Sequence, residues 1–274
     1  MMKGMIRGVA VLIVCLAGLC SAEYRVYTKG AGDRSVWSAL LGGGQHRMEA
    51  HLFRDKDMGL CVVDEGGGKP VYGSLEKAMQ QHHCVAGVNG GYFGADAART
   101  PIGLVRHAGH TVTPLARRGF TVAGVVYDTG TELRMERSAR VQAPLSVMRE
   151  AIQGGPFLVE SGRVVSGLEN TRKAARTFIA TDGKGRWCLA VSSALTLREL
   201  AQWLAEPGCM GDFRVQSALN LDGGSSSAFW DKAAGVNVSG FKAVRNYVGI
   251  RPRSGGAPKG GSRSTKDAVA KPGR

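Results

Sequence analysis

The segment 218–227 reads Ala-Leu-Asn220-Leu-Asp222-Gly-Gly-Ser-Ser-Ser227, and the rest of the chain is interpreted around it. A short apolar run, typical of a strand, is interrupted by two polar side chains and leads directly into two glycines and three serines. Glycine lets the backbone approach a ligand closely and turn its amide N–H groups toward an anion. The segment therefore predicts a strand that ends at a binding site. The bland alternative is a hairpin turn, because Asp-Gly after a strand is a common turn signal.

Two further segments repeat this pattern. Residues 85–93 read Val-Ala-Gly-Val-Asn89-Gly90-Gly-Tyr92-Phe93, and residues 152–157 read Ile-Gln-Gly-Gly155-Pro156-Phe. Each segment alone fits an ordinary turn, but three of them together favour a common site. In such a site Asn89 would lie at the rim, and the rings of Tyr92 and Phe93 would offer faces against which a sugar ring can lie.

Strand-like runs outnumber helical ones. Short runs rich in β-branched and aromatic residues, separated by turn signals, predict strands at 24–28, 60–64, 84–88, 103–106, 121–127, 157–159, 177–181, 187–192, 217–221 and 244–250. Because they do not alternate strictly with helices, we expect an α+β fold, a single domain of mixed β-sheet flanked by a few helices.

Two helices are predicted with clear end signals, and a third is weaker. Residues 74–83 follow a candidate Ser74 cap. Residues 196–205 begin with a Thr196/Glu199 capping box, carry an apolar stripe and stop before Pro207. A third helix is expected near 145–152.

Both ends of the chain have their own composition. Residues 1–22 carry Lys3 and Arg7 before an eleven-residue apolar run and small residues, which is the pattern of a signal peptide. We place the folded domain at 23–250 and a disordered, basic tail at 251–274, where seven basic residues face Asp267 alone. The expected location is secreted or periplasmic, with no membrane span after the signal peptide is removed.

Composition and charge exclude several classes of protein. The chain has 274 residues, 43% of them hydrophobic and 21% charged, and its 40 glycines follow no collagen period. No apolar run reaches the roughly 18 residues of a membrane span. A polytopic membrane protein, a fibrous protein and a wholly disordered chain are therefore excluded. The tail carries +6 of the net charge of +14, half of what remains after the signal peptide is removed, so we expect the tail to contact an anionic envelope polymer, or to have no partner, rather than to bind nucleic acid.

Four cysteines lie beyond the signal peptide, which is an even number in an oxidising compartment. Their spacing suggests the local disulfides Cys61–Cys84 and Cys188–Cys209, and four buried thiols are the alternative. No C-x-x-C motif supports a structural zinc site.

Five motifs in a fixed order give the chain a family resemblance. They are Asn89-Gly-Gly-Tyr-Phe93, Pro101-Ile-Gly103, Gly155-Pro156, Ala175-Arg176-Thr177 and Asn220-Leu-Asp-Gly-Gly-Ser-Ser226. Together they resemble the phosphodiester glycosidase family, which includes the lysosomal N-acetylglucosamine-1-phosphodiester alpha-N-acetylglucosaminidase. The match is closest to short exported bacterial members, which share the helix Thr196-Leu-Arg-Glu-Leu-Ala201.

The resemblance implies an exported hydrolase that cleaves the glycosidic bond of a sugar 1-phosphodiester in envelope or extracellular glycans. A phosphate monoester leaves without protonation, so one carboxylate can suffice where ordinary glycosidases use two. We expect Asp222 to supply it, Arg176 to bind the phosphate as a bidentate fork, and Asn89 to orient a hydroxyl or water. The expected substrate-binding residues are Gly90, Tyr92, Phe93, Gly155, Pro156, Thr177, Asn220, Gly223, Gly224, Ser225 and Ser226.

Other interpretations remain beside this one. Asp222 and Arg176 could instead form a buried ion pair that joins two strands. The chain has Ser192-Ser-Ala194 where longer family members carry an Asp-Gly loop, which leaves open a non-catalytic glycan- or phosphate-binding envelope protein. A serine hydrolase is disfavoured because the run 223–227 lacks the last glycine of a nucleophile elbow.

Metal and cofactor chemistry has little support in the sequence. The pairs His82-His83 and His107-x-x-His110 lack the glutamate of a zinc protease motif, and Asp182 reads as a turn residue. We expect no cofactor, and a divalent cation near Asp222 is left open.

Overall fold

The computed structural model describes residues 22–29 and 46–253. The expected signal peptide and the tail beyond residue 253 lie outside the described residues. Within them, strands make up most of the regular structure and helices are few. The protein is therefore mostly β, and the helical share of the expected α+β fold is small.

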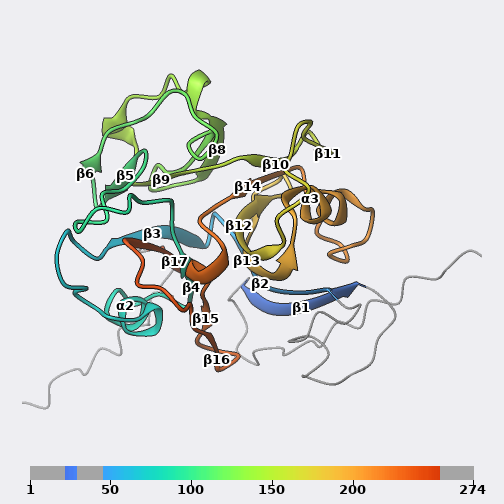
Figure 1. Cartoon of the computed structure of the whole chain (residues 1–274), viewed down its shortest axis with the longest axis horizontal. Coiled ribbons are helices and arrows are strands. Elements are labelled where there is room, and N and C mark those ends of the chain that lie inside the picture. The colour runs from blue at the N-terminus through green and yellow to red at the C-terminus, as the bar shows by residue number, and fades with distance from the viewer. Residues whose placement is uncertain (1–21, 30–45, 254–274) are drawn as a thin grey trace, which may run out of the picture.

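The described residues form three sheets (Figure 1). Sheet 1 has the order β1 (Glu23–Lys29), β2 (His46–Arg54), β13 (Arg186–Leu195), β12 (Ala174–Thr181), β14 (Ser217–Asn220), β10 (Phe157–Glu160) and β11 (Arg163–Val164). Sheet 2 has the order β16 (Val236–Val238), β15 (Phe229–Asp231), β4 (Ala86–Asn89), β17 (Asn246–Pro252) and β3 (Met58–Asp64). Sheet 3 has the order β6 (His110–Thr113), β5 (Val105–His107), β9 (Glu150–Gly154), β7 (Gly124–Asp128) and β8 (Leu133–Arg137).

All strand pairs within these sheets are antiparallel, so the expectation of a mixed sheet is wrong. The physical reason is the scarcity of helices. Parallel neighbours need long crossover connections, which are usually helical, and this chain supplies few of them.

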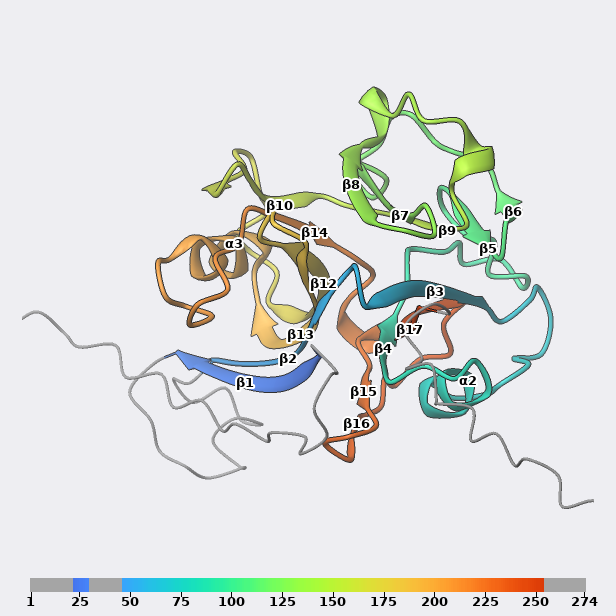
Figure 2. The ribbon, with the colours of Figure 1, turned by 180° about the vertical axis from the view of Figure 1, so that it is seen from behind.

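Both helices with clear end signals are confirmed. Helix α2 (Leu75–Gln81) is capped by the Ser74 side chain, and α3 (Leu197–Ala205) begins with the full Thr196/Glu199 capping box. Figure 2 shows α2 beside sheet 2 and α3 beside the β10 end of sheet 1. The third predicted helix, at 145–152, is wrong. That stretch contains one 3-10 turn and the start of β9, which pairs with β5 and β7.

The sheets are joined by apolar packing and by buried carboxylates. One core cluster includes Leu60 from sheet 2, Ile152 from sheet 3 and Leu219 from sheet 1, all of them buried. Asp128 accepts a hydrogen bond from Leu60 N at 2.8 Å, and Glu150 accepts one from Val62 N at 3.1 Å. These carboxylates of sheet 3 therefore accept hydrogen bonds from backbone N–H groups on the unpaired edge of β3, the last strand of sheet 2.

The predicted disulfides are not formed in this structure. Cys61, Cys84 and Cys188 are buried free thiols, and Cys209 is a half-buried one. The spacing argument overlooked that cysteine is also a small apolar core residue, which is how these side chains are used here. Cys61 and Cys84 belong to the core between α2 and sheet 2.

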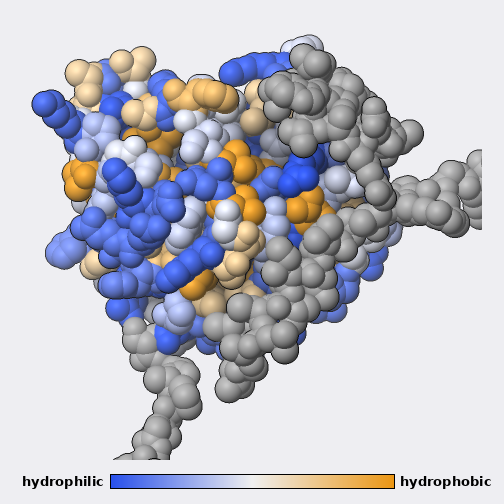
Figure 3. Space-filling model, turned by 90° about the horizontal axis from the view of Figure 1, so that it is seen from below, coloured by the Kyte–Doolittle hydropathy of each residue, from blue (hydrophilic) through white to orange (hydrophobic). Residues whose placement is uncertain are grey.

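The face of the molecule seen from below is mainly polar (Figure 3). Figure 3 shows hydrophilic residues interrupted by small apolar patches on the face seen from below. No helix in ranges 22–29 and 46–253 is long and apolar enough to cross a membrane.

Candidate active site

The three segments singled out in the sequence meet where the sheets join. Asp222, after β14, donates its backbone N–H to the carbonyl of Gly90, which follows β4, at 3.1 Å. Gly155, after β9, donates its own to the carbonyl of Asn220 at 2.8 Å, and Asn220 N donates to Pro156 O at 3.0 Å. Strand ends from all three sheets therefore form one group of loops.

Glycines in these loops allow neighbouring parts of the chain to pack closely together. A methyl group added at Gly90 would lie 2.0 Å from Asn246 Oδ1, one at Gly155 would lie 2.1 Å from Phe120 O, and one at Gly223 would lie 2.9 Å from Ala175 O. The space that glycine leaves is filled by protein, so close approach to a ligand is not needed to explain these three positions.

Asn89 is buried at the centre of the site and uses both ends of its amide. Nδ2 donates to the carbonyl of Asp222 at 2.7 Å, while Oδ1 accepts from Thr177 Oγ1 at 2.7 Å and from Ala228 N at 3.0 Å. The side chain thus holds the Asp222 loop against β12. Its predicted role in orienting a hydroxyl or water stays a prediction, because its amide is already occupied by protein groups.

Asp222 is a half-buried carboxylate on a fixed loop. Its Oδ1 accepts from Gly223 N at 2.9 Å, and the Ser226 side chain hydrogen-bonds the carboxylate. Burial raises the pKa of Asp222, while these two donors and the charges of Lys242 and Arg172 pull in the opposite direction. The result is a carboxylate with a raised pKa that still faces positive charge.

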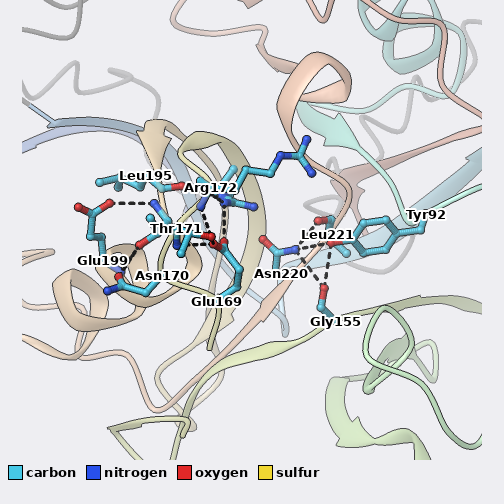
Figure 4. A network of polar contacts seen from close by, with 12 residues as sticks. Tyr92, Gly155, Glu169, Asn170, Thr171, Arg172, Leu195, Glu199, Asn220 and Leu221 are labelled. Carbon is cyan, nitrogen blue, oxygen red and sulfur yellow. Dashed lines mark hydrogen bonds and ion pairs between the residues drawn. The ribbon is translucent and has the colours of Figure 1, made fainter. Parts of the chain in front are cut away.

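Tyr92, Gly155 and Asn220 form a second polar group (Figure 4), and the charge of Asp222 acts on Tyr92. The Tyr92 hydroxyl donates to Gly155 O at 3.1 Å and lies 2.7 Å from Nδ2 of Asn220, which also donates to Gly155 O. Burial, and then the charge of Asp222, raise the pKa of Tyr92 to about 12, so the hydroxyl stays protonated. The buried Oδ1 of Asn220 has no hydrogen-bond partner within the described ranges.

Arg176 is buried in β12, and its guanidinium is largely occupied. Nε donates to Leu195 O at 2.8 Å, Nη2 donates to Arg172 O at 2.6 Å, and Glu169 lies 3.7 Å away as an ion-pair partner. The ion pair of Arg176 within the described residues is thus with Glu169, and the alternative of an Asp222–Arg176 pair is wrong.

Two cations that the sequence analysis did not select act on Asp222. Arg172 lies in the loop before β12, and a methyl group added at Gly224 would lie 3.6 Å from its Nη2. Lys242 lies in the loop before β17, and its Nζ is 4.9 Å from the centre of the Phe93 ring. Lys242 N and its neighbour Phe241 N both donate to Ser225 O, which fixes this loop at the rim. Neither cation belongs to a sequence motif, so no signal along the chain could have identified them.

The histidines set aside in the sequence have ordinary partners. His82 Nε2 lies 2.8 Å from the Tyr72 hydroxyl, and His107 Nδ1 lies 3.3 Å from Glu150. Asp182 caps the turn before β13 by accepting from Lys184 N and Arg186 N, as predicted. Among the described residues, no three His, Cys, Asp or Glu side chains are grouped to hold a metal ion.

The described residues form an antiparallel β fold in which the half-buried Asp222 lies among loop ends and is faced by the charges of Arg172 and Lys242. The family model described as phosphodiester glycosidase matches residues 82–251. The chain belongs to the phosphodiester glycosidase family. No curated protein matches the sequence significantly.

Solved structures with the same fold are distant in sequence. The zebrafish N-acetylglucosamine-1-phosphodiester alpha-N-acetylglucosaminidase catalytic domain, auto-inhibited by its pro-peptide, is 14% identical with a TM-score of 0.60, over 90% of this chain and 89% of that one. An exported protein of Burkholderia pseudomallei is 12% identical with a TM-score of 0.53, over 78% and 76%. A hypothetical protein from Synechocystis is 16% identical with a TM-score of 0.52, over 83% of this chain and 62% of that one. At these identities the likeness shows the fold.

Proposed function

We propose that this protein is an exported hydrolase that cleaves the glycosidic bond of a sugar 1-phosphodiester in envelope or extracellular glycans. The observation that carries the proposal is Asp222, a half-buried carboxylate held by Gly223 N and Ser226 and faced by the charges of Arg172 and Lys242. Export is supported by the residue pattern of 1–22 and by the exported protein from Burkholderia with the same fold.

The chemistry needs one carboxylate and a place for negative charge. The bond between the anomeric carbon and the bridging oxygen breaks, and its electron pair leaves on the phosphate, which needs no proton. Asp222 either activates water or attacks the anomeric carbon, and water supplies the hydroxyl of the released sugar. Glu169, the carboxylate paired with Arg176, is bound within its own loop, so the proposal gives the reaction to Asp222 alone.

The aromatic side chains at the site fit a sugar substrate. The Tyr92 ring lies beside Asp222, and the Phe93 ring lies under Lys242 at the rim. We propose that Tyr92 and Phe93 contact the sugar, and that the N–H and O–H groups of Gly224, Ser225 and Ser226 face its oxygens or those of the phosphate. Thr177 and Pro156 shape the site through their contacts with Asn89 and Asn220.

A non-catalytic glycan- or phosphate-binding protein is the second candidate. The observation that favours it is Ser192–Ser193: Ser192 Oγ donates to Ser193 O, and Ser193 Oγ accepts from Arg47 N on the neighbouring strand β2. Longer family members carry an Asp-Gly loop at this point, so an acid that serves them is missing from this chain.

Turnover separates the two candidates. The purified protein and its Asp222→Asn variant are incubated with a panel of sugar 1-phosphodiesters, with and without a chelator, and products are followed by mass spectrometry. We expect the wild type to release free sugar and the variant to bind the same compounds without releasing it. Saturable binding with no product in either form would reject the hydrolase and support the binding protein. Loss of turnover with chelator would reveal a cation at the site.

A further inference from the structure

The loop 169–173 is fixed in place before any ligand arrives. Glu169 accepts hydrogen bonds from the Thr171 hydroxyl at 2.7 Å, from Thr171 N and from Arg172 N, so its carboxylate closes the loop on itself. Asn170 Oδ1 accepts from Thr196 Oγ1 at 3.0 Å, which ties the loop to the start of α3. Figure 4 shows these contacts gathered on one side of the site.

Arg176, on β12, connects this loop to sheet 1. Its Nη2 donates to Arg172 O and its Nε donates to Leu195 O, the last residue of β13. Arg176 is only 8% exposed, and its ion pair with Glu169 adds a third link to the loop. Through these contacts the Arg176 guanidinium fixes the position of the main chain at Arg172.

The Arg172 side chain is the part of the loop that remains free. It is exposed, and in the part of the chain that the structure describes its guanidinium has no hydrogen-bond or ion-pair partner. It lies over Gly224, two residues from Asp222, and its charge opposes the rise that burial causes in the pKa of both Asp222 and Tyr92. An unpaired, planar set of N–H donors on a fixed loop is suited to phosphate oxygens.

We propose that Arg172 binds the phosphate of the substrate, with Lys242 as a second cation, and that Arg176 and Glu169 are positioning residues that act through Arg172. This assignment rests on the hydrolase proposed above, and it replaces the expectation that Arg176 itself grips the phosphate. As the glycosidic bond breaks, charge grows on the phosphate, so a fixed cation there stabilises the transition state more than the ground state.

Inorganic phosphate tests the binding site separately from turnover. Its affinity is measured by calorimetry for the wild type, Arg172→Gln, Arg176→Lys and the double variant, with Arg163→Gln, an exposed arginine on β11, as the matched control. We expect Arg172→Gln to weaken phosphate binding about tenfold or more, since a charge-assisted hydrogen bond is lost. Arg163→Gln is expected to match the wild type.

The double variant separates positioning from direct contact. If Arg176 acts only through Arg172, Arg176→Lys weakens phosphate binding on its own but adds nothing to Arg172→Gln. Additive losses would show that Arg176 contacts phosphate itself and would overturn its positioning role. Glu169→Gln, which loosens the loop without touching the bond to Leu195, is expected to behave like Arg176→Lys, so the test survives if Arg176→Lys fails to fold.

The remaining outcomes test the phosphate site and the hydrolase proposal separately. Phosphate binding in Arg172→Gln equal to the wild type, or no phosphate binding in any form, would overturn the proposal. Phosphate binding that depends on Arg172 in a protein without turnover would keep the anion site and reject the hydrolase. On an active protein we expect Arg172→Gln to lower kcat by about 100-fold, whereas Arg163→Gln leaves kcat and KM unchanged.

Discussion

The side-chain amide of Asn89 donates a hydrogen bond to the main-chain carbonyl of Asp222 across 133 residues of sequence, with an N–O distance of 2.7 Å. This contact joins the end of β4 in sheet 2 to the loop after β14 in sheet 1. Asn89, which is fully buried, therefore fixes the main chain of Asp222 and, through it, the position of the carboxylate.

Replacing Asn89 is expected to damage the fold and the site together. Asn89→Ala removes the side-chain partner of Asp222 O and Ala228 N and leaves Thr177 Oγ1 with its longer contact to Ser227 Oγ, and an unsatisfied buried polar group costs about 1–3 kcal/mol. We expect the free energy of unfolding to fall by about 3 kcal/mol in urea titrations. The matched control is Asn237→Ala, whose exposed amide donates to Glu76, and its expected change is under about 0.5 kcal/mol. Equal effects in the two variants would contradict the role given to Asn89.

His51 and Asp231 form another link between sheets. Nδ1 of His51 in β2 lies 2.5 Å from Oδ2 of Asp231 in β15, and both side chains are buried. Oδ1 of Asp231 also accepts from Ala234 N at 2.9 Å, so the carboxylate is fixed on both sides. His51→Leu is expected to cost about 3 kcal/mol, because it leaves the buried carboxylate without its main partner.

The control for this variant is an ion pair on the surface. Glu132→Gln weakens the exposed pair between Glu132 and Arg134, and exposed pairs contribute about 0–1 kcal/mol. Thermal unfolding of the two variants and the wild type measures both effects. If Glu132→Gln destabilised the protein as much as His51→Leu, burial would not explain the contribution of the His51–Asp231 pair to stability.

The sequence predicts the elements whose signals are local. All ten predicted strands overlap observed ones, because apolar runs bounded by turn residues define a strand without its neighbours. The sequence does not predict strand β2, because His46, Arg47 and Glu49 give it a polar start, and its pairing with β1 and β13 is what makes it a strand. The sequence predicts a helix where β9 begins, because the pairing of β9 with β5 and β7 leaves no signal along the chain.

For the site, the sequence predicts the segments with local signals but not the two cations. The meeting of Asn89, Gly155 and Asp222 follows from three similar strand ends, and the structure brings them together. The positions of Arg172 and Lys242 depend on contacts made by Arg176 and Ser225, which no spacing along the chain encodes.

The thiols of Cys188 and Cys209 are expected to react slowly in the folded protein. Burial raises the pKa of Cys209 to about 11 and that of Cys188 further, so little thiolate exists at pH 8. Labelling with an aromatic disulfide reagent should modify Cys209 first and Cys188 only on unfolding. In guanidinium all four thiols should react. A count of two or fewer under those conditions would show a disulfide in the isolated protein and contradict the free thiols of the structure.

Removing the charge of Asp222 is expected to stabilise the protein while it abolishes turnover. Burial raises the pKa of Asp222 in the folded state above its unfolded value of about 3.9. The folded protein then binds the proton more tightly than the unfolded chain, so stability declines as the pH rises through these two values and stays lower above them. Asp222→Asn lacks this penalty. Its Tm should exceed that of the wild type at pH 7, and the difference should vanish below about pH 3.9.

Asp212 gives the control of opposite sign. The pKa of Asp212 is lowered by its hydrogen bonds with Arg25 and Arg186, so its charge favours the folded state at neutral pH. Asp212→Asn should therefore lower the Tm at pH 7, with a small effect because Asp212 is exposed. Differential scanning calorimetry of the wild type and both variants between pH 3.5 and about pH 7 measures the two signs together. A lower Tm of Asp222→Asn at pH 7 would mean that the contacts of its carboxylate with Gly223 and Ser226 outweigh the cost of burying it.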